Sequence, residues 1–144
     1  MRAELSRALR EHDDWLVRVL RTRLSYRPPI HLRRIQLEWD VMSIHGGLSL
    51  SGRATDMCGD DASEAAPELP SRRLWPRSLG NRIGATEDRG WHDAAVECVQ
   101  RWIVDCYRRA KPTPPCPVYL SVHEGMGRGI NLATGRRTSF RESC

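Results

Sequence analysis

The 144-residue chain has little of several features that would identify its class. No apolar run approaches the ~20 residues that a membrane-spanning helix needs, which argues against a membrane protein. Charges interrupt the first 24 residues throughout, so we expect no secretory signal there. The five cysteines are expected to be reduced thiols. Together with the lack of a secretory signal, reduced thiols favour a cytoplasmic location.

The cysteines form no close CxxC pair, and zinc sites usually contain such pairs. Cys98 and Cys106 would share one face of a predicted helix, but ~12 Å apart along its axis. That separation is too large for a disulfide between them. We therefore expect free thiols, no metal site and no cofactor.

Phenylalanine and lysine are almost absent. Phe140 and Lys111 are the single examples, so nearly all of the 23 basic residues are arginine, in a chain of net charge +5. The planar guanidinium suits phosphates, which leaves a small nucleic-acid-binding protein with Arg-rich surfaces as an alternative function. The arginines are spread through every segment, however, and a genome whose codons favour arginine explains the excess more simply.

One segment reverses the sign of the charge. Residues 38–70 hold seven acidic residues against one arginine. Residues 55–73 within it show no helical or strand periodicity, so we predict a flexible acidic loop. Crowded carboxylates repel one another, and a basic partner would relieve that repulsion. The predicted partner-binding residues are Asp56, Asp60, Asp61, Glu64 and Glu68 in this loop, with Glu38 and Asp40 on the preceding strand.

Hydrophobic periodicity predicts the regular elements. Apolar residues recur at helical spacing from Leu5 to Leu20, and a second helix is predicted from about residue 87 or 90 to Ala110. Alternation predicts strands over 35–45 and 48–54, joined as a hairpin. A second hairpin is predicted from 118–122 to 130–132.

The element order α-β-β-α-β-β predicts an α+β fold, with two helices packed on one face of an antiparallel sheet of about four strands. We expect one domain over 1–144, with a frayed polar tail at 134–144. The predicted core consists of Leu9, Leu16, Leu37, Trp39, Leu50, Cys98, Trp102, Leu120 and Val122.

Two motifs suggest chemistry. Glu38 and Asp40 are two residues apart on a predicted strand, so their carboxylates leave the same face ~6.6–7 Å apart. Such a pair can hold Mg²⁺ in a metal-dependent hydrolase, a second alternative, although the polar face of an amphipathic strand is the simpler interpretation. The glycine-rich residues 125–129 resemble a phosphate-binding loop but lead into a predicted strand, so a hairpin turn explains them better. We predict no catalytic residues and do not expect an enzyme.

The amphipathic N-terminal helix, the strand Leu37-Glu38-Trp39-Asp40-Val41, the Gly46-Gly47 hairpin and the acidic segment form a recognisable combination. In architecture it resembles the small cytoplasmic immunity proteins of bacterial contact-dependent inhibition systems. The resemblance implies a non-enzymatic protein that binds and blocks one cognate toxin domain. Inhibitors of nuclease toxins are often acidic, whereas this chain is basic, so the resemblance implies contact through residues 56–68.

Overall fold

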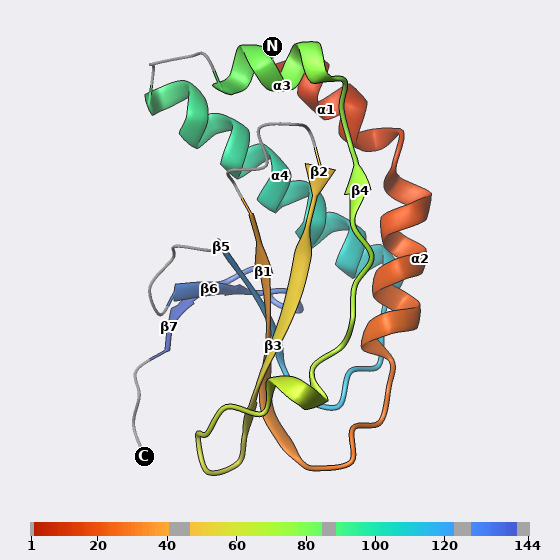
Figure 1. Cartoon of the computed structure of the whole chain (residues 1–144), viewed down its shortest axis with the longest axis vertical. Coiled ribbons are helices and arrows are strands. Elements are labelled where there is room, and N and C mark those ends of the chain that lie inside the picture. Colours follow the sequence, from red (N-terminus) through yellow and green to blue (C-terminus); the bar gives the residue numbers. More distant parts are fainter. Residues whose placement is uncertain (1, 41–46, 85–88, 123–127, 141–144) are drawn as a thin grey trace.

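A computed structural model describes residues 2–40, 47–84, 89–122 and 128–140 (Figure 1). The helices are α1 (Arg2–Arg10), α2 (Asp13–Leu24), α3 (Arg77–Gly84) and α4 (Arg89–Ala110), with a 3₁₀ turn η1 (Ser63–Ala65). The strands are β1 (Leu32–Trp39), β2 (Gly47–Leu48), β3 (Leu50–Asp56), β4 (Arg72–Arg73), β5 (Val118–Val122), β6 (Arg128–Asn131) and β7 (Arg137–Ser139). Most of both predicted hairpin turns lies outside the described residues.

The main sheet has five strands in the order β3-β1-β5-β6-β7. Both predicted hairpins are confirmed as antiparallel pairs, β1 with β3 and β5 with β6. The two hairpins join through β1 and β5, which are parallel, so the predicted antiparallel sheet of about four strands is a mixed one. Parallel neighbours need a long crossover connection, here one that includes α4. The residues of the two hairpin turns do not indicate how the hairpins pair with each other. The sequence therefore could not reveal the parallel pairing of β1 with β5.

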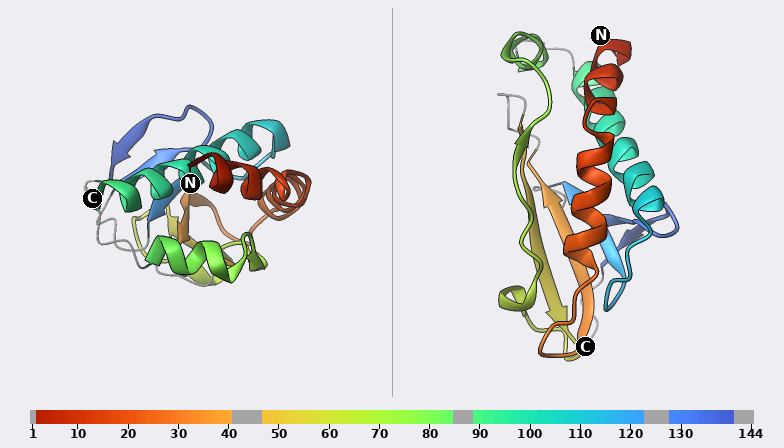
Figure 2. Two further views of the ribbon diagram at one scale, coloured as in Figure 1. Left: turned by 90° about the horizontal axis from the view of Figure 1, so that it is seen from above. Right: turned by 90° about the vertical axis from the view of Figure 1, so that its right-hand side faces the viewer.

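Helices α1, α2 and α4 lie on one side of β1 and β3, with α4 alongside the two N-terminal helices (Figure 2). The sheet turns alternate residues towards them, because side chains alternate between the two faces of a strand. Ile35 and Leu37 of β1 and Leu120 of β5 are therefore buried, while Gln36 and Glu38 face the other side half-buried. The α+β class is as predicted, but the described residues form four helices where two were expected, and three of them, α1, α2 and α4, make up the layer on this side.

The N-terminal helix predicted through Leu20 is two helices. α1 ends at Arg10, and His12 adopts φ −109° and ψ 7° before α2 begins. The His12 Nε2 atom lies 3.0 Å from the carbonyl oxygen of Leu74, on the segment that leads to α3. Leu9 before the break and Leu16 after it are both buried. The hydrophobic stripe therefore continues across the break, and the sequence pattern does not indicate that the helix is interrupted.

The tail predicted as frayed over 134–144 contains β7, which pairs with β6. Phe140 follows it and packs edge-on against Tyr119 at 4.9 Å between ring centres. The Arg34 guanidinium lies 4.6 Å from the same ring. A Cβ atom on Gly129 would come within 2.9 Å of Phe140, so glycine makes room for the ring. A single aromatic residue in a polar segment forms no periodic pattern. The sequence therefore predicted a frayed tail there.

The hydrophobic core forms one cluster that draws on all the helices and on β1, β3 and β5. Seven of the nine predicted core residues are buried. Cys98 is half-buried at the edge of the cluster, and the side chain of Val122 lies outside the described part. The core also includes Leu74 and Leu79, which are not among the predicted core residues.

Candidate functional site

The acidic segment begins within the sheet and has a defined shape at its tip. Asp56, the last residue of β3, accepts hydrogen bonds at Oδ1 from the backbone N–H groups of Cys58 and Asp60, each at 2.9 Å. Its own backbone N–H donates to the Asp60 carbonyl oxygen at 2.9 Å. Gly59 completes the turn with φ +89°, a conformation that favours glycine. Asp56 is therefore a structural residue of the turn rather than a free contact group.

The segment then returns to the sheet. The Ala62 backbone N–H donates to the Ala54 carbonyl oxygen at 2.8 Å, and η1 follows directly. Further on, Pro67 packs over Gly52, where a Cβ atom would lie 2.6 Å from the Pro67 carbonyl oxygen. Residues 55–73, predicted as a flexible loop, thus contain a turn, η1 and β4, with contacts to β3 that fix their course.

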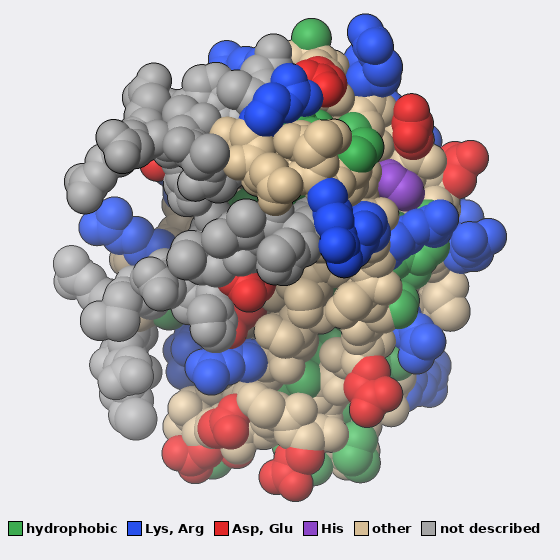
Figure 3. Space-filling model, turned by 45° about the horizontal axis from the view of Figure 1, so that its top comes forward, with side chains coloured by type: hydrophobic (Ala, Val, Ile, Leu, Met, Phe, Trp, Pro, Cys, Tyr) green, Lys and Arg blue, Asp and Glu red, His purple; other side chains and the backbone are tan. Residues whose placement is uncertain are grey.

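The other four acids predicted in this segment, Asp60, Asp61, Glu64 and Glu68, are exposed. Asp61 accepts a hydrogen bond from the Ser63 hydroxyl group. Within the described ranges, none of the ion pairs involves Asp60, Asp61, Glu64 or Glu68. Acidic side chains gather at the lower end of the view in Figure 3, the end where β3 meets η1 in Figure 1. The structure therefore presents uncompensated carboxylates on a fixed turn.

An apolar recess of about 600 Å³ lies beside this turn, and the sequence did not predict it. Met57 belongs to the acidic tip and is 64% exposed, while Ile30, between α2 and β1, is 46% exposed. Both line the recess together with Tyr26, Pro28, His31 and Pro115. Isolated apolar residues 27 positions apart in the chain carry no common pattern, so only the fold brings them together.

The two other predicted acids lie elsewhere: Glu38 is on β1, and Asp40 follows the end of that strand at Trp39. Glu38 pairs with Ser51 across the β1–β3 ladder, five residues from Asp56 along β3, or about 17 Å. The Glu38 side chain is 15% exposed and its Oε1 atom lies 3.5 Å from Arg53 Nε. The structure therefore separates Glu38 from the acidic turn, and the Glu38 carboxylate is engaged by a cation. Among the residues described, no three His, Cys, Asp or Glu side chains are grouped as a metal site requires.

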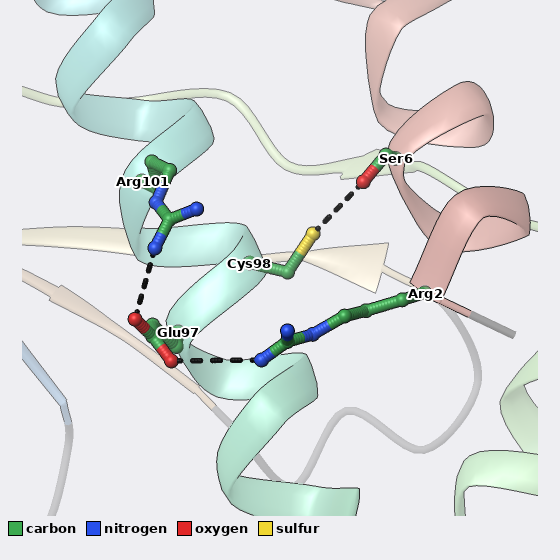
Figure 4. Close-up of polar contacts among 5 residues, drawn as sticks. All are labelled: Arg2, Ser6, Glu97, Cys98 and Arg101. Carbon is green, nitrogen blue, oxygen red and sulfur yellow. Dashed lines mark hydrogen bonds and ion pairs between the residues drawn. The ribbon is translucent and has the colours of Figure 1, made fainter.

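A second concavity, of about 300 Å³, lies between α1 and α4 (Figure 4). The Ser6 hydroxyl lies 3.3 Å from the Cys98 sulfur at its wall. At its mouth Glu97 binds two cations, Arg101 at 2.9 Å and Arg2 at 3.8 Å. Figure 4 thus shows a contact between Ser6 and Cys98 and a separate ion-pair network of Arg2, Glu97 and Arg101, whose side chains are at least half exposed.

Two further described thiols, those of Cys106 and Cys116, are protected by burial. Burial raises the pKa of Cys106 to about 12, with the nearby Asp13 carboxylate contributing. Burial alone raises the pKa of Cys116 to about 11. Both thiols therefore stay protonated near neutral pH, and a nucleophilic role is unfavourable for either.

Comparison with protein-family models, with curated proteins and with solved structures finds no match for this chain. No helix in the described ranges is long and apolar enough to cross a membrane.

Proposed function

We propose that this protein is a non-catalytic protein-binding module that binds and blocks a cognate protein, in the manner of the toxin-directed immunity proteins it resembles. One observation carries the proposal. The exposed carboxylates of Asp60 and Asp61 on a hydrogen-bonded turn, and of Glu64 in the adjoining η1, lie outside every ion pair of the described residues in a chain of net positive charge. A fixed acidic surface of this kind is complementary to a basic protein surface.

The acidic surface would affect both the rate and the affinity of binding. Like charges held close together oppose folding, and a basic partner removes that penalty on binding. Complementary charges also steer encounter, which raises the association rate at low salt. Because Asp56 already fixes the turn, little loop ordering remains to be done on binding.

The first experiment identifies and rebuilds the complex. The tagged chain captures its partner from the native host, and the two proteins are then purified separately and recombined. We expect a stoichiometric complex that abolishes the partner's toxic activity. Failure of every captured protein to form such a complex from purified components would remove the proposal.

Charge variants locate the contact in that rebuilt complex. Asp60→Asn, Asp61→Asn and Glu64→Gln together should slow association about tenfold at low salt and less at high salt. Glu11→Gln, Asp14→Asn and Asp93→Asn form the matched control, because they remove the same charge from exposed positions on the helices and on the turn between α1 and α2. Equal association rates for the two triple variants would exclude the acidic turn from the interface.

One observation keeps nucleic-acid binding as a second candidate. The Arg72 guanidinium lies 5.2 Å from the Trp15 ring centre, and the adjacent Arg73 is exposed. Arginine beside an aromatic ring is a combination found in single-strand binding surfaces. Binding of a random-sequence oligonucleotide that falls steeply with salt, and that Arg72→Gln with Arg73→Gln weakens, would favour this function.

A further inference from the structure

The recess beside the acidic turn has the features of a preformed anchor site. Proline residues at two of its walls, Pro28 and Pro115, restrict the backbone there. The Tyr26 hydroxyl donates to the Ala65 carbonyl oxygen at 2.8 Å and so ties the α2–β1 connection to η1. Its volume, about 600 Å³, lies within the ~300–1,000 Å³ typical of ligand pockets.

The exposure of its apolar side chains also requires explanation. Among described residues, Ile30 and Met57 are the two large hydrophobic side chains that are strongly exposed, and both line this one recess. Scattered exposed hydrophobic residues are ordinary, but clustering around a concavity beside uncompensated charges is typical of binding surfaces. Interfaces commonly combine a buried apolar anchor with a charged rim.

Charge around the recess is asymmetric. Asp60 and Asp61 follow Met57 on the side of the acidic turn, whereas Arg27 lines the side of the α2–β1 connection. A ligand segment with basic residues on both sides of its anchor would meet Arg27 unfavourably. A segment with basic residues on one side only would satisfy both walls.

We propose that the recess receives one aliphatic or aromatic side chain from the partner, carried on a segment whose lysine or arginine residues lie to one side of that anchor. This inference rests on the proposed protein-binding function and adds the chemistry of the contacting segment. The carboxylates govern encounter, and the apolar anchor governs how long the complex lasts.

A random peptide library displayed on phage tests the inference on the isolated full-length chain and requires no identified partner. We expect selected peptides to contain an apolar residue with lysine or arginine on one side. These peptides should bind Met57→Ser and Ile30→Ser at least tenfold more weakly, while Met57→Leu retains binding. Both side chains are exposed, so the serine variants should melt like the wild-type chain. No enrichment, or enriched peptides that bind Met57→Ser unchanged, would overturn the proposal.

The rebuilt complex separates this inference from the function on which it rests. We expect Met57→Ser to accelerate dissociation about tenfold and leave association unchanged, the reverse of the charge variant. A stable complex whose dissociation rate is unchanged by Met57→Ser and Ile30→Ser would refute the anchor. The protein-binding function would remain supported. Dimers of the isolated chain that Met57→Ser dissociates would show instead that a second copy fills the recess, which would also overturn the proposal.

Discussion

Replacing Asp13 by alanine tests how α2 is held against α4. Asp13 Oδ1 accepts a hydrogen bond from Trp102 Nε1, and Oδ2 accepts one from Arg109 Nη1, each at 2.7 Å. Trp102 is 8% exposed, so loss of its acceptor leaves an N–H group with little access to water. An unsatisfied buried donor costs ~1–3 kcal/mol. The exposed Arg109 adds little, because solvent screens its ion pair.

We therefore expect Asp13→Ala to lower the free energy of unfolding by ~2 kcal/mol and the melting temperature by roughly 4–8 °C. Urea and thermal denaturation, followed by circular dichroism, measure both quantities. Asp14→Ala is the matched control, because it removes an exposed acid from the same first turn of α2 and so matches any helix-dipole effect.

A double-mutant cycle isolates the hydrogen bond itself. Trp102→Phe keeps an aromatic ring but removes the N–H group, so Asp13→Ala should destabilise that background by ~1 kcal/mol less than it destabilises the wild type. Independent effects of Asp13→Ala and Trp102→Phe would refute the reasoning. An Asp13→Ala protein that melts within about one degree of Asp14→Ala would refute it as well.

Two further predictions concern the packing of the acidic segment and the thiols. Gly52→Ala places a Cβ atom 2.6 Å from the Pro67 carbonyl oxygen and should destabilise the fold by ~1–3 kcal/mol; a melting temperature equal to that of wild type would contradict this packing. In the folded chain at pH 8, the exposed Cys58 should react with a thiol reagent long before Cys106, whose pKa of about 12 leaves about one thiol in 10⁴ ionised. Because Cys106 is fully buried, it should be labelled only when the fold opens. Mass spectrometry of the labelled peptides distinguishes the sites, and equal labelling would show that Cys106 is accessible.

Much of the fold could be predicted because burial imposes periodicity on the sequence. The stripe that contains Trp102 and Cys106 defines α4, whose start at Arg89 and end at Ala110 agree closely with the predicted range. Alternation likewise defines β1 and β5, where Leu37 and Leu120 are buried neighbours across the parallel pair. These features are local, and a local pattern does not depend on how the rest of the chain folds.

Features that depend on distant partners were beyond the sequence. The parallel pairing of β1 with β5 joins segments more than eighty residues apart. The break at His12 accompanies a contact with Leu74, and the ordered position of Phe140 depends on Gly129 and Arg34. None of these contacts changes the periodicity of the segment in which it occurs.

The candidate site shows the same division between local and distant information. Charge is visible in the sequence, so Asp60, Asp61 and Glu64 stand out there as part of a distinct acidic group. Their geometry was not visible, since a run of carboxylates does not show that Asp56 accepts two backbone hydrogen bonds and thereby shapes the turn.

The apolar component of the proposed site was invisible for a different reason. Ile30 follows two prolines and Met57 follows an aspartate, and neither belongs to the hydrophobic pattern of a predicted helix or strand. Single hydrophobic residues are common on protein surfaces and carry no functional signal. Their significance comes from convergence on one recess, which depends on the antiparallel register that places Leu32 opposite Asp56. A one-residue slip of that register would turn the side chains of β3 to the opposite face and move Met57 relative to Ile30. The β1–β3 pairing therefore positions the recess as well as the core, and a binding site assembled in this way becomes recognisable only after the register is known.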